Sequence, residues 1–279
     1  MKLSEMRRCL DERQIQLTKS LGQNFLHDEH QLQRIVDLAG VTASDKVLEI
    51  GPGLGPLTDV ILLRASEVLA VEKDRRLVEV LEERLRDHPK LKIIAADALL
   101  WLRRELRDWS DWKMVSNLPF SVASPILVEL ASSMTGPISI TTTLQLEVAH
   151  RLMAKATDDD YGILTLLIQA NYEPGEWFKI PPGSFFPSPG IDSACLILRR
   201  RTKPLVAPAL RKNYERIVKR AFSERRKKMM KLLKFDWPAS RVNLAFETLG
   251  LDLKVRAEKV SLEDFVRLTE MLSSDEIGS

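Results

Sequence analysis

The tetrapeptide Asn117-Leu118-Pro119-Phe120 follows a short apolar run and combines hydrogen-bond acceptors with an aromatic face. The Asn117 side-chain oxygen and the Leu118 carbonyl can accept both hydrogens of an exocyclic amine on a base, and Phe120 can stack on that base. An adenine amino nitrogen is a poor nucleophile because its lone pair is delocalised into the ring, so the two acceptors would direct that lone pair at an electrophilic methyl group. Alone, such a motif more often marks a polar strand end with a proline turn, and the neighbouring motifs decide between the two interpretations.

A second motif, Lys46 to Gly55 (KVLEIGPGLG), leads from an apolar strand into a glycine-rich turn. Gly51 and Gly53 allow the backbone to turn sharply and to approach a ligand closely. The spacing G-x-G-x-G differs from that of dinucleotide enzymes, and Glu49 would repel phosphate but could orient a cationic ligand. We therefore expect S-adenosylmethionine, which carries an ammonium and a sulfonium, rather than NAD. A turn that serves only the strand-to-helix geometry is the alternative.

Two acidic residues end the next two apolar runs. Glu72 stands where a nucleotide-binding βαβ unit places its acceptor for ribose hydroxyls. Asp97 can accept a hydrogen bond from an adenine amino group, although on its own it is equally well explained as the N-cap of the following helix. Because the carboxyl ends of parallel strands meet at one edge of a sheet, both acids are expected beside Gly51 and Asn117 in one pocket.

Strands that alternate with helices must position these motifs. Strands are predicted at residues 46–50, 67–71, 91–95, 113–116, 138–145, 173–180 and 193–199, and helices at 57–64, 74–87, 99–107, 123–133, 147–155 and 163–170. A helical arm at residues 1–18 and a helix that ends near Gly40 precede them. This order predicts an α/β fold with a doubly wound, mostly parallel sheet, in which the last two strands form an antiparallel hairpin at one edge.

The C-terminal part of the chain predicts helices alone. A linker begins near Pro204. Residues 210–270 predict four or five helices, most of them short; the first is longer and spans about 212–233. We therefore predict two domains, residues 1–202 and 203–279.

Composition limits the class of protein. The chain has 279 residues, of which 44% are hydrophobic, so it can bury a sizeable core. It has no apolar run of the ~18 residues that a membrane-spanning helix needs, and its charged N-terminus lacks the apolar segment of a secretory signal. Two distant cysteines and four histidines that do not cluster with them indicate reduced thiols, a cytoplasmic location and no metal site.

The charge of the chain is unevenly distributed. The net charge is only +3, but residues 199–234 contain fifteen Lys and Arg against Glu215 and Glu224, a local balance of +13 that leaves −10 for the remainder. This asymmetry predicts contacts with the phosphates of a polyanion, with a solvated helix face as the alternative. We expect the protein to be a monomer.

In their order, these motifs resemble the KsgA-type ribosomal RNA adenine dimethyltransferases, relatives of the Erm resistance methyltransferases. The matching segments are KSLGQNFL at 19–26, EIGPGLG at 49–55, Glu72, Asp97, NLPF at 117–120, QLEVAHRL at 145–152, YG at 161–162, PPGSFFPSPGIDSA at 181–194 and AFSERRK at 221–227. The resemblance implies a Rossmann-like class I methyltransferase domain, a C-terminal helical domain and S-adenosylmethionine as cofactor. It also implies N6,N6-dimethylation of two adjacent adenosines in the 3′-terminal hairpin of 16S rRNA, in a pre-30S particle during ribosome biogenesis.

The resemblance assigns roles to individual residues. Asn117 would lie at the boundary between cofactor and substrate, where its side chain and the Leu118 carbonyl face the target amine. Phe120 and Phe185 would stack on the target adenine from two sides, although Phe185 taken alone is more simply a core aromatic. The predicted cofactor-binding residues are Asn24, Leu26, Gly51, Gly53, Glu72, Asp97 and Asn117.

One departure from the family and three other functions stay open. The KsgA group usually has tyrosine at the position of Phe120; phenylalanine keeps the stacking face without the hydroxyl, and it also occurs among the Erm relatives. The first alternative is an Erm-type enzyme acting on 23S rRNA. The long helical domain and the F-x-P-x-P segment disfavour it. The second is a non-catalytic RNA-binding assembly factor, which the intact Asn117 and Glu72 disfavour. A DNA adenine methyltransferase is a weaker third.

Overall fold

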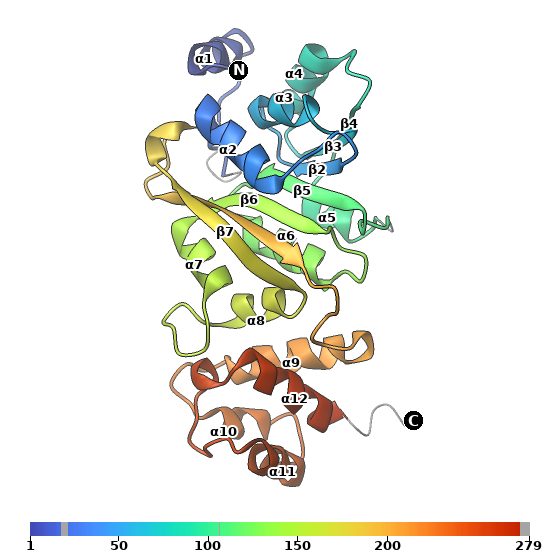
Figure 1. The fold of residues 1–279 in the computed structure, drawn as a ribbon. Coiled ribbons are helices and arrows are strands. Elements are labelled where there is room, and N and C mark those ends of the chain that lie inside the picture. The colour runs from blue at the N-terminus through green and yellow to red at the C-terminus, as the bar shows by residue number, and fades with distance from the viewer. Residues whose placement is uncertain (18–21, 106, 274–279) are drawn as a thin grey trace. The chain divides into compact units, whose positions relative to one another are not determined.

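The computed structural model describes residues 1–17, 22–105 and 107–273 (Figure 1). The first residues of the KSLGQNFL segment, 19–21, therefore lie outside the described part. By its packing the chain divides into two units, one formed by Met1–Ala149 with Pro174–Arg200 and the other by His150–Glu173 with Arg201–Ser279. No helix of the described ranges is both long enough and apolar enough to cross a bilayer.

A seven-stranded sheet organises the first unit, with the strand order β4-β3-β2-β5-β6-β9-β7. Neighbouring strands from β4 to β6 run parallel, and β9 is antiparallel to β6. The strands are β2 (Lys46–Ile50), β3 (Glu67–Glu72), β4 (Leu91–Ala95), β5 (Trp112–Asn117), β6 (Ser139–Gln145), β7 (Tyr172–Ile180) and β9 (Ser193–Arg200). The predicted α/β class and the mostly parallel sheet are confirmed.

The two strands predicted as an edge hairpin, β7 and β9, are indeed neighbours at one edge of the sheet. Strand β9 is inserted between β6 and β7, so the earlier strand, β7, forms the edge. Burial explains this order: the first six residues of β9 are buried, whereas most of β7 is exposed or half-buried. An apolar strand is stabilised by two neighbours and a partly polar strand tolerates the edge.

Helices cover both faces of the sheet. Helices α2, α3 and α4 lie on one face, and α5 and α6 lie on the other (Figure 1). Helix α2 begins after Asp28, whose side chain accepts hydrogen bonds from two backbone N–H groups. Its predicted end near Gly40 is confirmed, and Gly40 has a left-handed conformation. The bounds are α1 (Leu3–Glu12), α2 (Glu29–Ala39), α3 (Pro56–Leu62), α4 (Arg75–Leu85), α5 (Ala98–Leu102), α6 (Ala123–Ser132), α7 (Leu146–Met153) and α8 (Ile163–Gln169).

The central strands β2 and β5 separate at their carboxyl ends. The last paired residues of the two strands are Leu48 on β2 and Met114 on β5, so the pairing ends two residues before the end of β2 at Ile50. Beyond that point the Ser116 hydroxyl accepts the hydrogen bond of the Ile50 N–H at 2.8 Å, in place of a backbone carbonyl. The chain also reverses its winding direction between these two strands, and such a switch point opens a crevice for ligands.

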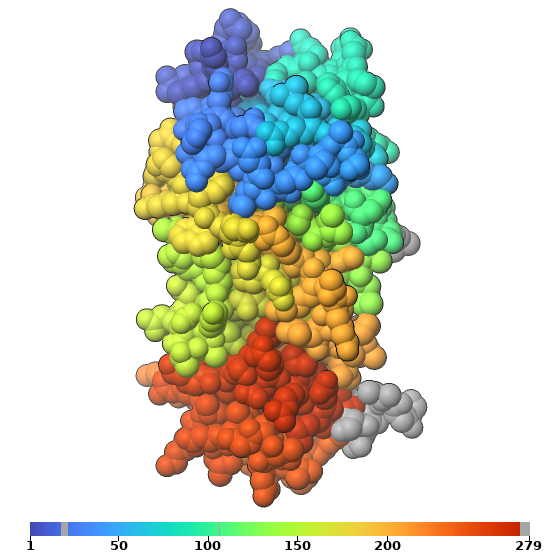
Figure 2. All heavy atoms as spheres, viewed as in Figure 1, coloured from blue at the N-terminus to red at the C-terminus, as the bar shows by residue number. Residues whose placement is uncertain are grey.

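In its described residues, which end at 273, the second unit is helical apart from the start of β7. It contains α8, four later helices and short 3-10 turns, and the space-filling view shows the C-terminal residues gathered into one mass (Figure 2). An aromatic cluster holds it together: Phe222 stacks on Phe265 at 6.0 Å and meets Tyr161 edge-on at 6.4 Å between ring centroids. The later helices are α9 (Arg211–Ala221), α10 (Met229–Leu233), α11 (Ala239–Leu249) and α12 (Leu262–Ser273).

The single helix predicted for residues 212–233 is wrong, because the chain leaves the helix after Ala221 and starts α10 at Met229. The intervening segment contains four consecutive cations at 225–228. In a continued helix Arg225 and Lys228, three residues apart, would be like-charged neighbours. The Met229 N–H bonds instead to the Val255 carbonyl at 2.9 Å.

Residues 150–173 pack with the C-terminal unit rather than with the sheet unit. The Tyr214 hydroxyl donates to the Leu166 carbonyl at 3.0 Å, and Arg211 donates to Asn171 at 3.1 Å. The chain passes from the first unit to the second for the last time between Arg200 and Arg201, close to the predicted boundary. The division into functional domains 1–202 and 203–279 stays a prediction.

Candidate active site

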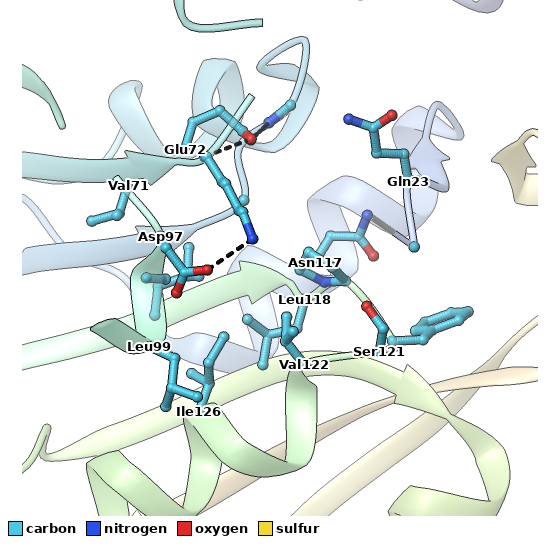
Figure 3. Close-up of a pocket in the computed structure, with 18 of the residues that line it drawn as sticks. Gln23, Val71, Glu72, Asp97, Leu99, Asn117, Leu118, Ser121, Val122 and Ile126 are labelled. Carbon is cyan, nitrogen blue, oxygen red and sulfur yellow. Dashed lines mark hydrogen bonds and ion pairs between the residues drawn. The ribbon is translucent and has the colours of Figure 1, made fainter. Parts of the chain in front are cut away.

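A cleft opens at the carboxyl ends of β2, β3 and β5, where the central strands separate (Figure 3). It encloses about 890 Å³ of space, a volume that includes its opening to solvent. The residues that line it are Gly22–Phe25, Ile50, Gly51, Gly53, Val71–Lys73, Leu77, Ala96–Leu99, Asn117–Val122 and Ile126. The predicted turns at 51–55 and 117–120 therefore share one cavity.

The glycine turn has the close contacts that its sequence suggests. Gly51 and Gly53 have φ angles of +70° and +61°, which other L-residues rarely adopt. A Cβ atom on Gly51 would lie 3.1 Å from the Pro119 ring, so this glycine lets the two turns approach each other. A Cβ atom on Gly53 would lie 2.6 Å from the ring of Phe25, which also lines the cleft.

Glu72 places a buried carboxylate in the wall of the cleft (Figure 3). One of its oxygens accepts the N–H groups of Lys73 and Asp74, both at 2.8 Å, and the other accepts that of Gly53 at 3.1 Å. Burial raises the pKa of this carboxyl, and the three N–H groups oppose that rise. Because the oxygen bonded to Gly53 keeps a second lone pair, it can still accept a hydroxyl hydrogen.

Asp97 has the first of its predicted roles, the N-cap, and its role toward an adenine stays a prediction. It is the N-cap of α5, accepting the Leu100 N–H at 3.1 Å, and it also lines the cleft. Lys73, which sequence reasoning missed, forms an ion pair of 2.9 Å with it (dashed line at Asp97 in Figure 3) and holds the pKa of Asp97 below its usual value. An adenine amino group at Asp97 would have to share the carboxylate with Lys73 or displace it.

The Asn117 side chain is held at both ends. Its Nδ2 donates to the Asn24 carbonyl at 2.9 Å, and its Oδ1 accepts the Thr143 hydroxyl. Leu118 and Phe120 complete this wall of the cleft, Leu118 buried and Phe120 half-buried. Sequence reasoning missed Thr143, because only the register of β5 and β6 makes it the neighbour of Asn117.

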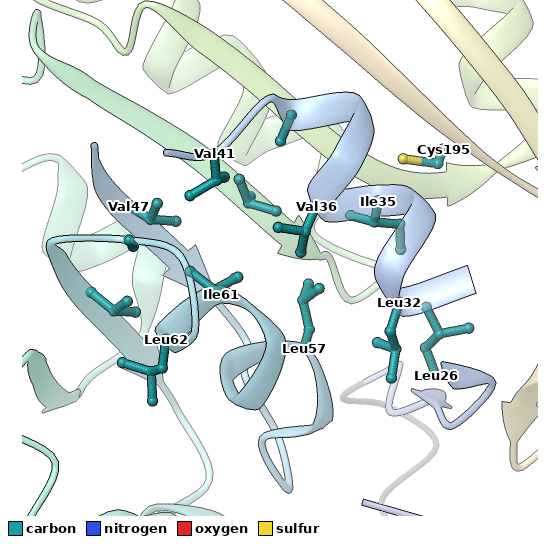
Figure 4. Packing of buried hydrophobic residues seen from close by; sticks show 14 of the residues in the cluster. Leu26, Leu32, Ile35, Val36, Val41, Val47, Leu57, Ile61, Leu62 and Cys195 are labelled. Carbon is teal, nitrogen blue, oxygen red and sulfur yellow. The ribbon is translucent and has the colours of Figure 1, made fainter. Parts of the chain in front are cut away.

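Two predicted site residues, Leu26 and Phe185, lie behind the cleft rather than in its wall. They face each other in the antiparallel ribbon formed by β1 (Phe25–Leu26) and β8 (Phe185–Phe186), and both belong to the apolar core that contains Val47 and Cys195 (Figure 4 shows Leu26). Phe185 is 3% exposed and contacts Phe120 edge-on, at 6.4 Å between centroids. Of the two aromatic rings, Phe120 and Phe185, only Phe120 lines the cleft. The roles assigned to individual residues stay predictions.

Glu49 does not face the cleft, so the expectation that it could orient a cationic ligand is not supported by its position. It shares a face of β2 with Val47, because alternate residues of a strand point the same way, and lies beneath α3. The Thr58 hydroxyl donates to Glu49 Oε2 at 2.7 Å. Burial raises the pKa of the Glu49 carboxyl from 4.5 to about 8.

Replacing Glu49 with glutamine should therefore stabilise the fold at alkaline pH. Below pH 4.5 the carboxyl is protonated in both states; between 4.5 and about 8 the unfolded chain loses the proton while the folded chain keeps it. The wild-type free energy of unfolding should therefore fall by up to about 1.4 kcal/mol per pH unit over that range and level off above it. Glu49→Gln abolishes this pH-dependent loss of stability. The variant is itself destabilised by about 1–3 kcal/mol at every pH, because its buried amide donors have no partner.

Urea unfolding at pH 5 and pH 8.5 measures the effect. The variant should be no more stable than the wild type at pH 5 and about 2–4 kcal/mol more stable at pH 8.5. Glu82→Gln, which removes an exposed carboxyl on α4, controls for the change in net charge. Parallel pH profiles of Glu49→Gln and the wild type would contradict the assignment of a buried, protonated carboxyl.

The strand order, the glycine turn after β2 and the acid at the end of β3 define the class of Rossmann-like methyltransferases. Within this class the chain belongs to the ribosomal RNA adenine dimethylase family, whose sequence model matches residues 14–274. The predicted resemblance and fold class are thus confirmed.

Relatives and solved structures agree with this family. The chain is 36% identical over 264 residues to the ribosomal RNA small subunit methyltransferase A of Geobacter metallireducens, covering 92% of this chain and 96% of that protein. It is 38% identical over 257 residues to the enzyme of the same name from Clostridium perfringens, covering 91% and 90%. The structure of the 23S rRNA methyltransferase ErmE is similar with a TM-score of 0.68 and 31% identity, covering 90% and 100%. A dimethyladenosine transferase from Plasmodium falciparum, 22% identical with a TM-score of 0.74 and covering 88% and 95%, shares the fold.

Proposed function

We propose that this protein is an S-adenosylmethionine-dependent enzyme that dimethylates N6 of two adjacent adenosines in the 3′-terminal hairpin of small-subunit ribosomal RNA. The observation that carries the proposal is the convergence of the Gly51–Gly55 turn, two acids and the Asn117–Phe120 turn on one cleft. The small-subunit enzymes at 36–38% identity support this substrate over the 23S rRNA of ErmE, which is 31% identical.

The cleft fits an adenosine-containing methyl donor. Glu72 offers a buried acceptor for ribose hydroxyls, and Asp97 a carboxylate for the adenine amino group. Gly53 leaves room that any side chain would remove, between the turn and Phe25. When bound, S-adenosylmethionine supplies an electrophilic methyl group on a sulfonium, which is an excellent leaving group.

The residues of the chain would act by alignment. Asn117 Oδ1 and the Leu118 carbonyl would hold the hydrogens of the target amine, so that its lone pair points into the cleft. Phe120, on the wall of the cleft, would stack on the base. Fixing one orientation of two reactants can contribute a large part of catalysis without a charged general base.

The basic segment 199–234 is only partly available for RNA. Several of its cations bind acids of the chain, such as Arg220 with Asp236 at 2.7 Å. Five exposed cations, for which no acidic partner is seen among the described residues, form what we term the 225–234 cluster: Arg225, Arg226, Lys228, Lys231 and Lys234. We propose that this cluster contacts RNA phosphates, that the substrate is a pre-30S particle, and that the protein works as a monomer in the cytoplasm.

Neutralising three members of the cluster should weaken RNA binding and reduce its salt dependence. In the triple variant Arg225→Gln, Arg226→Gln, Lys228→Gln, the slope of log K against log salt should become less steep by about 2–3, since each phosphate contact contributes about 0.9. Fluorescence anisotropy with a labelled rRNA hairpin between low and physiological salt measures the slope. The control carries the same substitutions at exposed cations of the first unit, Arg75, Arg86 and Lys92. An equal change in both variants would argue against phosphate contacts by the cluster.

Transfer of labelled methyl groups to purified particles tests the function. The wild type should methylate 30S subunits isolated from cells that lack the modification, and mass spectrometry should locate two dimethylated adenosines. Naked 23S rRNA is offered in parallel, and methylation there alone would favour the Erm-type function. Cofactor binding by calorimetry without turnover on either RNA would favour the non-catalytic assembly factor.

A further inference from the structure

The orientation of the Asn117 carboxamide depends on a residue of the neighbouring strand. Asn117 is the last residue of β5, and its paired residue on β6 is Thr143. Directly paired residues point to the same face of a sheet, so the two side chains meet. Thr143 is completely buried, and its hydroxyl donates to Asn117 Oδ1.

The second contact of Asn117 excludes the flipped carboxamide. Its Nδ2 donates to the Asn24 carbonyl at 2.9 Å, and an oxygen in that place would face another oxygen. With Nδ2 held there, Oδ1 lies at the Thr143 hydroxyl, which rotates to donate to it. One lone pair of Oδ1 is then used, and the second is left for the amine of a substrate.

The same strand provides an internal comparison. Thr141, two residues before Thr143, points to the same face and is equally buried. Its hydroxyl makes no hydrogen bond within the described part of the chain. A buried hydroxyl on this face is therefore tolerated without a hydrogen-bond partner, whereas the Thr143 hydroxyl donates to Asn117 at the cleft.

We propose that Thr143 is a positioning residue for methyl transfer: it holds Asn117 Oδ1 in the orientation that accepts the target amine. This inference rests on the proposed function for its effect on rate, but the contact itself can be tested without substrate. Thr143 does not line the cleft, so its removal should change turnover rather than cofactor binding.

Replacing Thr143 with valine keeps the shape and removes the hydroxyl. We expect kcat on 30S subunits to fall about 10–100-fold, since misplacing a reacting group by about 1 Å can cost 10²-fold. The KM for the RNA and the Kd of S-adenosylmethionine should stay within about three-fold of wild type, because Asn117 still lines the cleft. Thr143→Ser, which restores a hydroxyl, should recover most of kcat, and Thr141→Val should match the wild type.

A second readout uses the free protein. The side-chain NH₂ signals of Asn117, assigned in ¹⁵N NMR spectra by their loss in Asn117→Asp, should broaden or shift in Thr143→Val and stay unchanged in Thr141→Val. Unchanged signals together with unchanged kcat in Thr143→Val would overturn the inference. Equal losses of cofactor binding and stability in the two valine variants would also overturn it, because they would mark a purely structural role. If the wild type methylates neither RNA, the proposed function fails, and the NMR comparison alone then decides whether Thr143 orients Asn117.

Discussion

Asn117→Ala should lower kcat for methyl transfer by about 10²–10³-fold, the loss typical for removal of one preorganised hydrogen-bonding group at a reacting centre. The substitution removes the acceptor for the target amine and the Nδ2 contact to the Asn24 carbonyl. It also leaves the buried Thr143 hydroxyl without its acceptor. Single-turnover transfer of labelled methyl to 30S subunits, with both substrates saturating, measures the effect on the chemical step.

Cofactor affinity separates this outcome from a general loss of structure. Calorimetry should give a Kd for S-adenosylmethionine within about ten-fold of wild type, because Glu72 and the glycine turn are unchanged. Asn243→Ala, an exposed position on α11, serves as the matched control and should leave kcat unaltered. A kcat for Asn117→Ala within three-fold of wild type would remove the central residue of the proposed function.

Gly53→Ala should abolish cofactor binding at ordinary concentrations, with an affinity loss of about 10²-fold or more. The left-handed φ of +61° costs an alanine about 1–2 kcal/mol. The added methyl group would also lie 2.6 Å from the Phe25 ring, which must then move in the wall of the cleft. The backbone strain is present with and without cofactor and therefore lowers stability, whereas the displacement of Phe25 in the wall of the cleft lowers the affinity. A ten-fold loss of affinity corresponds to about 1.4 kcal/mol.

Two other glycines divide this effect into its parts. Gly40 has a φ of +57° but open space around it, so Gly40→Ala should lower stability by about 1–2 kcal/mol without changing cofactor affinity. Gly190 has neither the strained φ nor a close neighbour, so Gly190→Ala should match the wild type in both. If Gly53→Ala binds the cofactor no more weakly than Gly40→Ala does, the close approach of Gly53 to Phe25 is unimportant for cofactor binding.

The sequence alone determined the fold class and most of the cleft. Apolar runs, glycines and prolines act over a few residues, so the strands and the turns at Gly51–Gly55 and Asn117–Phe120 could be predicted closely. Parallel strands bring their carboxyl ends to one edge, and this general rule is sufficient to predict Glu72 and Asp97 in the same cavity.

Only the tertiary structure decided what those side chains bind. The partners of Asn117 lie 93 and 26 residues away, and they depend on where the N-terminal segment packs and on the register of β5 against β6. Glu49 turns beneath α3, and Phe185 turns into the core, because each side chain follows the face of its strand. Local patterns in the sequence set the type of each element, whereas contacts between distant elements are set by packing, which no local pattern contains.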